Sequence, residues 1–134
     1  MRSNAQWGAL IFGVAFLLAG ILGLFVENGM AMDADPATSG QLLGLFPVNL
    51  IHNVVHLALG AWGIAASRST DASRMYGRIG AGIYGALVVI AFLSPTLFGL
   101  APIGGNDIWL HVAFAAGLAW IGFAGDKRTA TAPH

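Results

Sequence analysis

The chain has 134 residues, the length of a single domain. Apolar residues make up 57% of it and charged residues only 9%, against about 25% in a typical soluble domain. Six basic residues balance six acidic ones, so the basic excess of a nucleic-acid-binding protein is missing. The sequence has no cysteine, which excludes disulfides, thiolate metal sites and a cysteine nucleophile. These properties predict an all-α integral membrane protein whose surroundings are the lipid bilayer.

Four apolar segments approach the length of about 20 residues that a membrane-spanning helix needs. The first segment could be a signal peptide, but its apolar run exceeds the usual 7–15 residues and no clear cleavage site follows it. The third reaches sufficient length if the Arg78 side chain extends to the membrane surface. The predicted spans are residues 7–26, 48–67, 75–93 and 107–124, which form a four-helix bundle in one domain over residues 1–134.

All basic residues fall on one side of this arrangement. Arg2 precedes the first span, three arginines lie in or beside the second loop, and Lys127 and Arg128 follow the last span. Cytoplasmic loops of membrane proteins are enriched in Lys and Arg. We therefore expect a multi-pass protein of the bacterial inner (plasma) membrane with both termini in the cytoplasm. Four of the six acids lie on the opposite side: Glu27, Asp33, Asp35 and Asp107.

The second half of the chain repeats the first at an offset of 55 residues. Residues 42–47 read Leu-Leu-Gly-Leu-Phe-Pro, and residues 97–102 read Leu-Phe-Gly-Leu-Ala-Pro. The repeat covers 42–67 and 97–122, and it predicts two helical hairpins in a parallel repeat, related by a pseudo-twofold axis along the membrane normal. Small residues four positions apart predict close helix contacts in spans 1 and 3. They are Ala15, Ala19 and Gly23, and Gly77, Ala81 and Gly85.

Three histidines and one aspartate form two pairs with a spacing of four residues. His52 and His56 share one helix face, about 6 Å apart along the axis. Asp107 and His111 occupy the same positions in the second repeat. Ionisable side chains inside a membrane are costly unless they have partners, so these residues are candidates for a functional site. Three asparagines flank them as structural polar residues, the first and last also as helix N-caps: Asn49, Asn53 and Asn106.

Four interpretations of this cluster remain open. His52, His56, Asp107 and His111 could bind a divalent metal such as zinc or copper. His56 and His111 could instead be the axial ligands of haem b. The same side chains could simply hydrogen-bond across helices and to carbonyl groups near the two prolines that precede the spans. They could also form a proton relay or a site for a small ligand.

Two motifs carry the pairs: Asn-x-x-His-Asn-x-x-His at residues 49–56 and Asn-Asp-x-x-Leu-His at residues 106–111. Together with the basic stretch at residues 74–78, they resemble a bacterial family of small four-span membrane proteins, common in actinobacteria and known only as a domain of unknown function. The resemblance implies the four-span topology and points to the same polar residues, but it implies no activity.

The sequence therefore predicts a small, non-enzymatic inner-membrane protein of unassigned activity. We expect a structural or accessory subunit of a larger membrane complex, whose partners are other membrane proteins or further copies of the chain. The alternative is a metal- or haem-binding membrane protein that uses the histidine cluster. No catalytic residue is predicted, because Ser-His-Asp, Walker, HExxH and GxGxxG patterns are missing.

Overall fold

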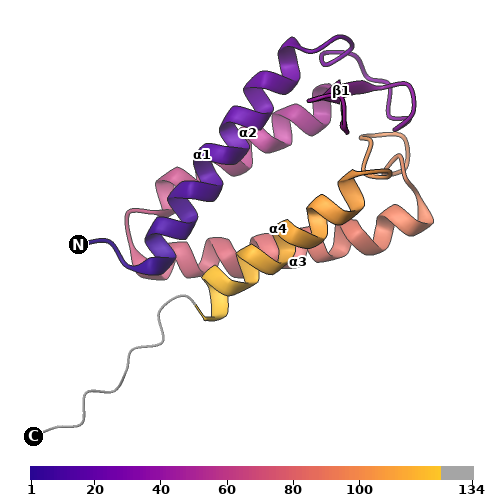
Figure 1. Cartoon of the computed structure of the whole chain (residues 1–134). Coiled ribbons are helices and arrows are strands. Elements are labelled where there is room, and N and C mark those ends of the chain that lie inside the picture. The colour runs from indigo at the N-terminus through magenta and orange to yellow at the C-terminus, as the bar shows by residue number, and fades with distance from the viewer. Residues whose placement is uncertain (125–134) are drawn as a thin grey trace, which may run out of the picture.

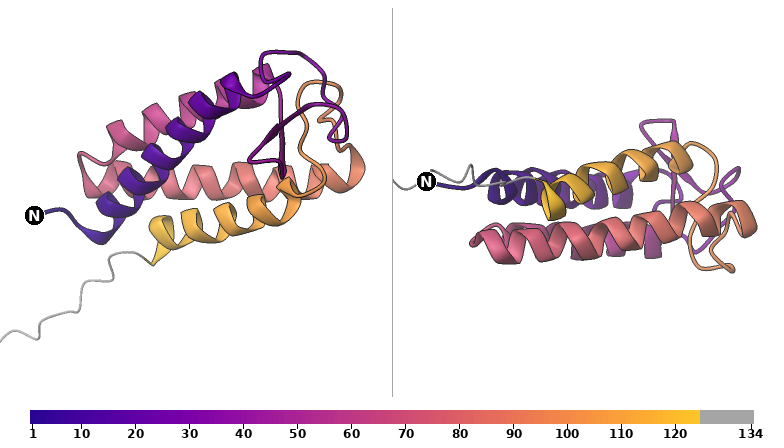
Figure 2. Two further views of the ribbon diagram at one scale, coloured as in Figure 1. Left: turned by 45° about the horizontal axis from the view of Figure 1, so that its top comes forward. Right: turned by 90° about the horizontal axis from the view of Figure 1, so that it is seen from below.

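A computed structural model describes residues 1–124 of the protein (Figure 1). It contains the helices α1 (Asn4–Phe25), α2 (Leu50–Ala66), α3 (Thr70–Leu93) and α4 (Asp107–Phe123), and the short strands β1 (Gly40–Leu42) and β2 (Phe46–Val48). The main helix contacts are between α1 and α2 and between α3 and α4, so the chain forms two helical hairpins (Figures 1 and 2). The predicted cytoplasmic residues Lys127 and Arg128 lie outside the described residues.

The fold is all-helical, as predicted. Three of the helices begin at other residues than the predicted spans, because capping residues set their N-termini. The Ser3 hydroxyl accepts from the Gln6 amide and the Gln6 side chain accepts from the Ser3 amide, so α1 begins before residue 7. Asn49 caps α2, because residues 46–48 belong to the hairpin strand. Ser69 caps α3, so this helix begins five residues before the predicted span at 75.

Helix length separates the four helices into two classes. α1 and α3 are long and apolar enough to cross a membrane, judged by length and composition. α2 and α4 are apolar but have only 17 residues each. At 1.5 Å per residue such a helix is about 26 Å long, slightly less than the ~30 Å hydrocarbon core of a bilayer.

The first loop contains an antiparallel β-hairpin that the sequence patterns did not predict, in which Gly40 pairs with Val48 and Leu42 with Phe46. Its turn places Leu43 and Gly44 at positive φ angles of 55° and 69°. The second loop has no strand in the described chain, yet the matching residues Phe98 and Gly99 also have positive φ, at 56° and 86°. The two repeat segments thus share a turn conformation.

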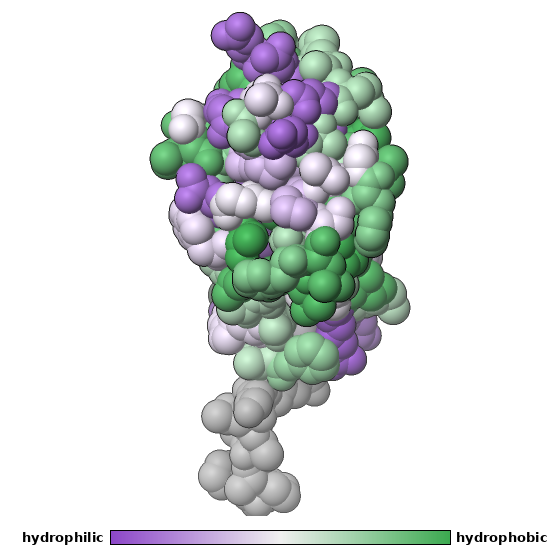
Figure 3. All heavy atoms as spheres, turned by 90° about the vertical axis from the view of Figure 1, so that its right-hand side faces the viewer, coloured by the Kyte–Doolittle hydropathy of each residue, from purple (hydrophilic) through white to green (hydrophobic). Residues whose placement is uncertain are grey.

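Both turns expose apolar side chains at the same end of the molecule. Figure 3 looks onto this end and shows hydrophobic residues beside hydrophilic ones. Leu43 is 75% exposed and Phe98 is 76% exposed, which shows that matching positions of the two loops face outward alike. The neighbouring Leu45 and Leu100 are exposed as well.

Close helix contacts form at glycines, but mostly not at the predicted stripes. A Cβ atom on Gly13 would lie 2.7 Å from the backbone nitrogen of Ile64, and one on Gly77 would lie 2.5 Å from that of Gly122. Of the predicted stripe residues, Gly23 and Gly77 are buried, whereas Ala15 is exposed and Gly85 faces open space. The prediction for α1 was largely wrong because its buried face runs through other positions: Ala5, Ala9, Gly13, Phe16, Gly20 and Gly23.

An aromatic layer joins the two hairpins at the centre of the bundle. Phe16 of α1 stacks on Tyr84 of α3 with parallel rings 5.6 Å apart. Phe114 of α4 packs edge-on against both, at 5.0 and 5.4 Å between ring centroids. The layer also contacts His56 and His111 and so forms one wall of the polar cluster.

Candidate metal site

Two short helices from different hairpins supply the four ionisable side chains. His52 and His56 lie on the buried face of α2, and Asp107 and His111 lie on that of α4. The spacing of four residues puts each pair on a single helix face. All four are buried, with at most 6% of the residue surface exposed. The structure thus brings together the four residues that the sequence singled out.

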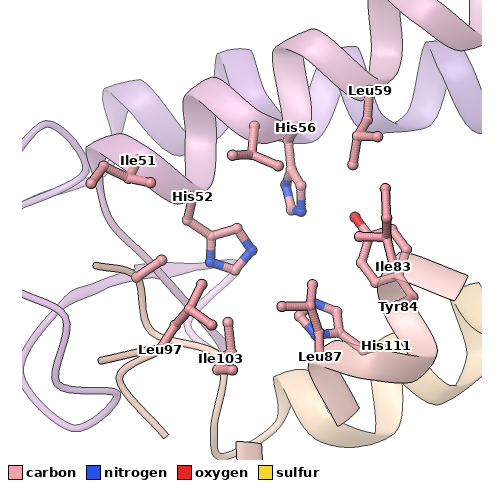
Figure 4. Close-up of a pocket in the computed structure, with 12 residues that line it drawn as sticks. Ile51, His52, His56, Leu59, Ile83, Tyr84, Leu87, Leu97, Ile103 and His111 are labelled. Carbon is pink, nitrogen blue, oxygen red and sulfur yellow. The ribbon is translucent and has the colours of Figure 1, made fainter. Parts of the chain in front are cut away.

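The three histidines form the tightest part of the cluster. One potential metal-ligand nitrogen from each of His52, His56 and His111 lies within 4.8 Å of the other two. The ring centroids of His52 and His56 are 4.4 Å apart, and those of His52 and His111 are 6.0 Å apart. Figure 4 shows the three rings directed toward one shared space.

Asp107 lies beside His52 and is not one of the three converging groups. Its Oδ2 atom is 3.6 Å from Nδ1 of His52. Histidines that bind metals commonly direct their second ring nitrogen to a carboxylate, which fixes the orientation of the ring. The position of Asp107 therefore suits a partner of His52 better than the fourth ligand that the sequence analysis considered.

Several polar atoms of the cluster are buried without a hydrogen-bond partner among the described residues. They are Nδ1 of His52, His56 and His111, and Oδ2 of Asp107. A buried polar atom without a partner costs about 1–3 kcal/mol. Nδ1 of His52 and Oδ2 of Asp107 lie 3.6 Å apart and can satisfy each other after a small shift. A bound cation is a group that could satisfy unpartnered imidazole nitrogens.

Asn49 and Asn53 make hydrogen bonds that connect α2 to the two loops. The Asn49 side-chain oxygen Oδ1 accepts from the His52 backbone amide at 2.9 Å and caps α2, while Nδ2 of Asn49 donates to the Leu100 carbonyl of the other loop. Asn53 Nδ2 donates to the Gly29 carbonyl at 2.9 Å. These bonds hold the histidine-bearing end of α2 against both loops.

Asn106 differs from its predicted role as a capping side chain. It precedes α4, but its backbone is already helical (φ −64°, ψ −18°) and its side chain makes no cap hydrogen bond. Instead Nδ2 donates to the Leu45 carbonyl at 3.0 Å, and the side-chain oxygen accepts from the Trp109 indole at 3.2 Å. Asn106 therefore joins the two loops.

The sequence of the chain matches a known protein family. The family described as "Domain of unknown function (DUF4383)" matches residues 6–124. The chain belongs to this family. The match confirms the predicted membership in a family of unknown function, and no curated protein and no solved structure matches the chain. The function of this DUF4383 protein must therefore be argued from its own site.

A cavity of about 160 Å³ adjoins the histidines. A dry cavity of about 150 Å³ in another protein holds benzene, which has a small fraction of the area of a porphyrin. The cavity is thus far too small for haem, and the geometry does not support His56 and His111 as its axial ligands.

Sequence reasoning missed the aromatic and aliphatic walls of this site. Tyr84 lines the cavity, and Figure 4 shows its hydroxyl directed toward the space that the histidines share. In a chain so rich in apolar residues, a lining Leu or Phe has no distinguishing signal. For Tyr84 the sequence did offer one signal, because the spacing of four residues puts Tyr76, Gly80 and Tyr84 on one helix face. The structure buries all three.

Proposed function

We propose that this DUF4383 protein is a four-span protein of the bacterial inner membrane that binds one divalent transition-metal ion through His52, His56 and His111. The observation that carries the proposal is the convergence of three buried imidazoles from two separate hairpins.

The outer surfaces of the helices support four spans. Large apolar side chains are exposed on every helix, whereas soluble proteins rarely expose extensive apolar patches. Although α2 and α4 are short, buried residues 47–48 and 101–103 precede them, and irregular backbone is tolerated at membrane depth when protein covers it. The exposed side chains include Leu18 and Leu22, Val54 and Val55, Val89 and Phe92, and Val112 and Trp120.

The basic residues of the described chain support a cytoplasmic N-terminus. Arg2 donates from Nη1 to both the carbonyl and the hydroxyl of Ser67 at 3.0 Å, which ties the N-terminus to the turn between α2 and α3 that contains Arg68. The loops at residues 27–49 and 94–106 lie at the other end of the bundle (Figure 2). By the positive-inside rule, the end with Arg2 and Arg68 faces the cytoplasm.

The two-hairpin repeat is part of the same proposal. Asn49 of the first half donates to the Leu100 carbonyl, and Asn106 of the second half donates to the Leu45 carbonyl. Leu45 and Leu100 are equivalent positions at the offset of 55 residues. A pseudo-twofold axis between the hairpins would relate these two acceptors but not the two donors, because the position equivalent to Asn49 is Gly104.

The donor set favours a metal that accepts imidazole. Zinc binds histidine nitrogen at about 2.0–2.1 Å, and copper also prefers such ligands. Three nitrogens around one ion are then roughly 3.4 Å apart, so small ring rotations from the present spacing complete the site. Asp107 would orient His52, and the fourth coordination position would face the cavity. This open position resembles a reactive or exchangeable site more than a closed structural one.

Metal analysis of the purified protein tests the proposal. The chain is purified in detergent without a polyhistidine tag, and zinc and copper are measured by elemental analysis. We expect about one ion per chain, and one Co²⁺ bound per chain after the metal is removed and the protein titrated. The variants His56→Ala and His111→Ala should lose this stoichiometric binding.

The fourth histidine provides a matched control. His134 lies outside the described residues, and His134→Ala should keep full binding. Helical circular dichroism and gel filtration establish that each variant is folded. Metal content that is far below one per chain, or equal in His111→Ala and His134→Ala, contradicts the metal site. A Soret absorption band that corresponds to one haem per chain would contradict the metal site and support haem binding.

As a second candidate we propose that the protein is an accessory subunit that docks on another membrane protein or on a second copy. The specific observation is on α3, where a Cβ atom on Gly82 or Gly85 would meet no other atom within 4 Å. Small residues on an outward face allow close approach of another helix in lipid. A photoreactive residue at position 82 should cross-link a partner in the membrane, whereas one at the exposed Leu18 of α1 should not. Equal cross-linking at both positions contradicts this docking face.

A further inference from the structure

The walls of the cavity beside the histidines carry no charged side chain. It is lined by α2, α3, the loop at residues 94–106 and His111 of α4 (Figure 4). Its polar lining residues are the three histidines and Tyr84. Its remaining walls are aliphatic, such as Leu59, Leu87 and Ile103.

The cavity opens sideways between α2 and α3. Among its lining residues, Val55 of α2 and Ile83 of α3 are exposed, whereas Leu59, Tyr84 and Ile103 are buried. Leu59 is nine residues beyond Leu50, about 14 Å down the helix. In the proposed membrane arrangement this opening faces lipid hydrocarbon and not water.

The proposed repeat explains why the space lies on one side of the bundle. The position equivalent to Leu59 is Phe114, at the offset of 55 residues. The Phe114 ring packs among Phe12, Phe16 and Tyr84. Leu59 has a smaller side chain than phenylalanine, and the cavity lies next to it, where a ring would otherwise fill the space.

We propose that this cavity binds a small, uncharged, apolar molecule that reaches it from the bilayer between α2 and α3. Its volume of about 160 Å³ matches that of a dry cavity that holds benzene. Its lack of charged lining disfavours a charged organic ligand, because a charge that no side chain pairs or coordinates is costly in such surroundings. Access from lipid depends on the proposed membrane arrangement, but the binding itself does not need the metal.

Fluorobenzene is a suitable test molecule, added to the chelator-treated, metal-free protein in detergent. We expect nuclear Overhauser contacts between fluorobenzene and both the His111 ring and the Leu87 methyl groups, which partitioning into the micelle would not give. Leu59→Phe should fill the cavity and weaken binding at least tenfold, whereas Leu18→Phe on the exposed face of α1 should not. Absence of these contacts in the wild-type protein, or unchanged binding by Leu59→Phe, overturns the proposal.

Two further measurements test the class of ligand and its route into the cavity. Benzoate should give no contacts, and contacts equal to those of fluorobenzene would overturn the uncharged class. Ile83→Trp should slow exchange of fluorobenzene or block binding, whereas Ile79→Trp, one turn away and also exposed, should not. Unchanged exchange in Ile83→Trp overturns the route between α2 and α3. If the protein binds fluorobenzene but no metal, the cavity proposal stands and the metal site is contradicted. If it binds metal but not fluorobenzene, the metal site stands and the cavity proposal is contradicted.

Discussion

The two helical hairpins share their architecture and differ where they meet the candidate site. Each has a long helix, a loop with a positive-φ turn, and a 17-residue helix that carries a histidine at equivalent positions, His56 and His111. Two of their differences lie one turn to either side of those histidines. His52 of the first hairpin corresponds to Asp107 of the second, and Leu59 corresponds to Phe114.

These two differences make the two sides of the site chemically unlike each other. A second histidine in place of Asp107 would give four similar rings, whereas the carboxylate beside His52 provides an acceptor that can orient one of three. A phenylalanine in place of Leu59 would fill the cavity. The shared features build the scaffold, and the differences provide what is specific to the proposed chemistry.

The largest effects are expected where both hairpins depend on glycine for close packing. Gly13→Ala and Gly77→Ala would each place a Cβ atom within 3 Å of backbone on the partner helix. Each should lower the free energy of unfolding by about 3 kcal/mol, because backbone cannot move aside as a side chain can. Thermal or detergent unfolding followed by helical circular dichroism measures the change.

Gly82→Ala is the matched control, because the space around Gly82 is open. It should be neutral or slightly stabilising, since alanine favours a helix by up to about 1 kcal/mol over glycine. A large loss in only one of Gly13→Ala and Gly77→Ala would contradict the view that the two hairpins are built alike.

These glycines also show what the sequence could predict about the fold. Apolar segments gave the four helices, because burial and lipid contact both require long apolar runs. The small residues at the helix contacts were not predictable, because 19 glycines allow many possible contact faces. Only the rotation of α1 about its axis places Gly13, and not Ala15, against the partner helix. The hairpin at residues 40–48 was missed because its strands have three residues each, too few for a periodic pattern.

The candidate site was more predictable than the contacts between helices. Ionisable residues are so rare in the spans that His52, His56, Asp107 and His111 stood out, and the spacing of four residues placed each pair on one face. The roles within the cluster were not predictable. Only the three-dimensional arrangement separates three converging rings from Asp107 beside His52, and only packing shows the cavity.

A second prediction addresses the difference between His52 and Asp107. If Asp107 orients His52, Asp107→Ala should keep one metal ion per chain but weaken its affinity about 10–100-fold. Competition with a chelator measures the affinity for Zn²⁺ or Co²⁺. The exposed acid Asp71 supplies a control, and Asp71→Ala should leave the affinity unchanged. Complete loss of stoichiometric binding in Asp107→Ala, as expected for the histidine variants, would make Asp107 a ligand.

A third prediction compares the two reciprocal asparagines. Asn49 is fully buried, caps α2 and bonds the opposite loop, so Asn49→Ala should cost about 2 kcal/mol of unfolding free energy. Asn106 is exposed and its side chain makes no cap hydrogen bond to α4, so Asn106→Ala should cost about 0.5 kcal/mol. Unfolding measured for both variants under one condition tests the ratio. Equal losses would mean that the bond between loops outweighs the cap and the burial.

The smallest expected effect concerns the outer loops, where the first hairpin has a polar turn without a counterpart in the second. The Thr38 hydroxyl and the Asp35 amide donate to the Asp33 carboxylate at 2.7 and 3.0 Å, and these bonds lower the pKa of Asp33 below its ordinary value. A carboxyl with a lowered pKa in the folded state stabilises above its unfolded pKa of about 3.9, and this contribution disappears as the pH falls through the folded value. Thr38→Val removes the larger cause, so a carbon-13 NMR titration should show the pKa of Asp33 rising toward its ordinary value. Because Asp33 is fully exposed, overall stability at neutral pH should hardly change. An unchanged Asp33 titration in Thr38→Val would show that the turn does not persist in solution. The loops of the two hairpins would then not differ by an ordered polar turn.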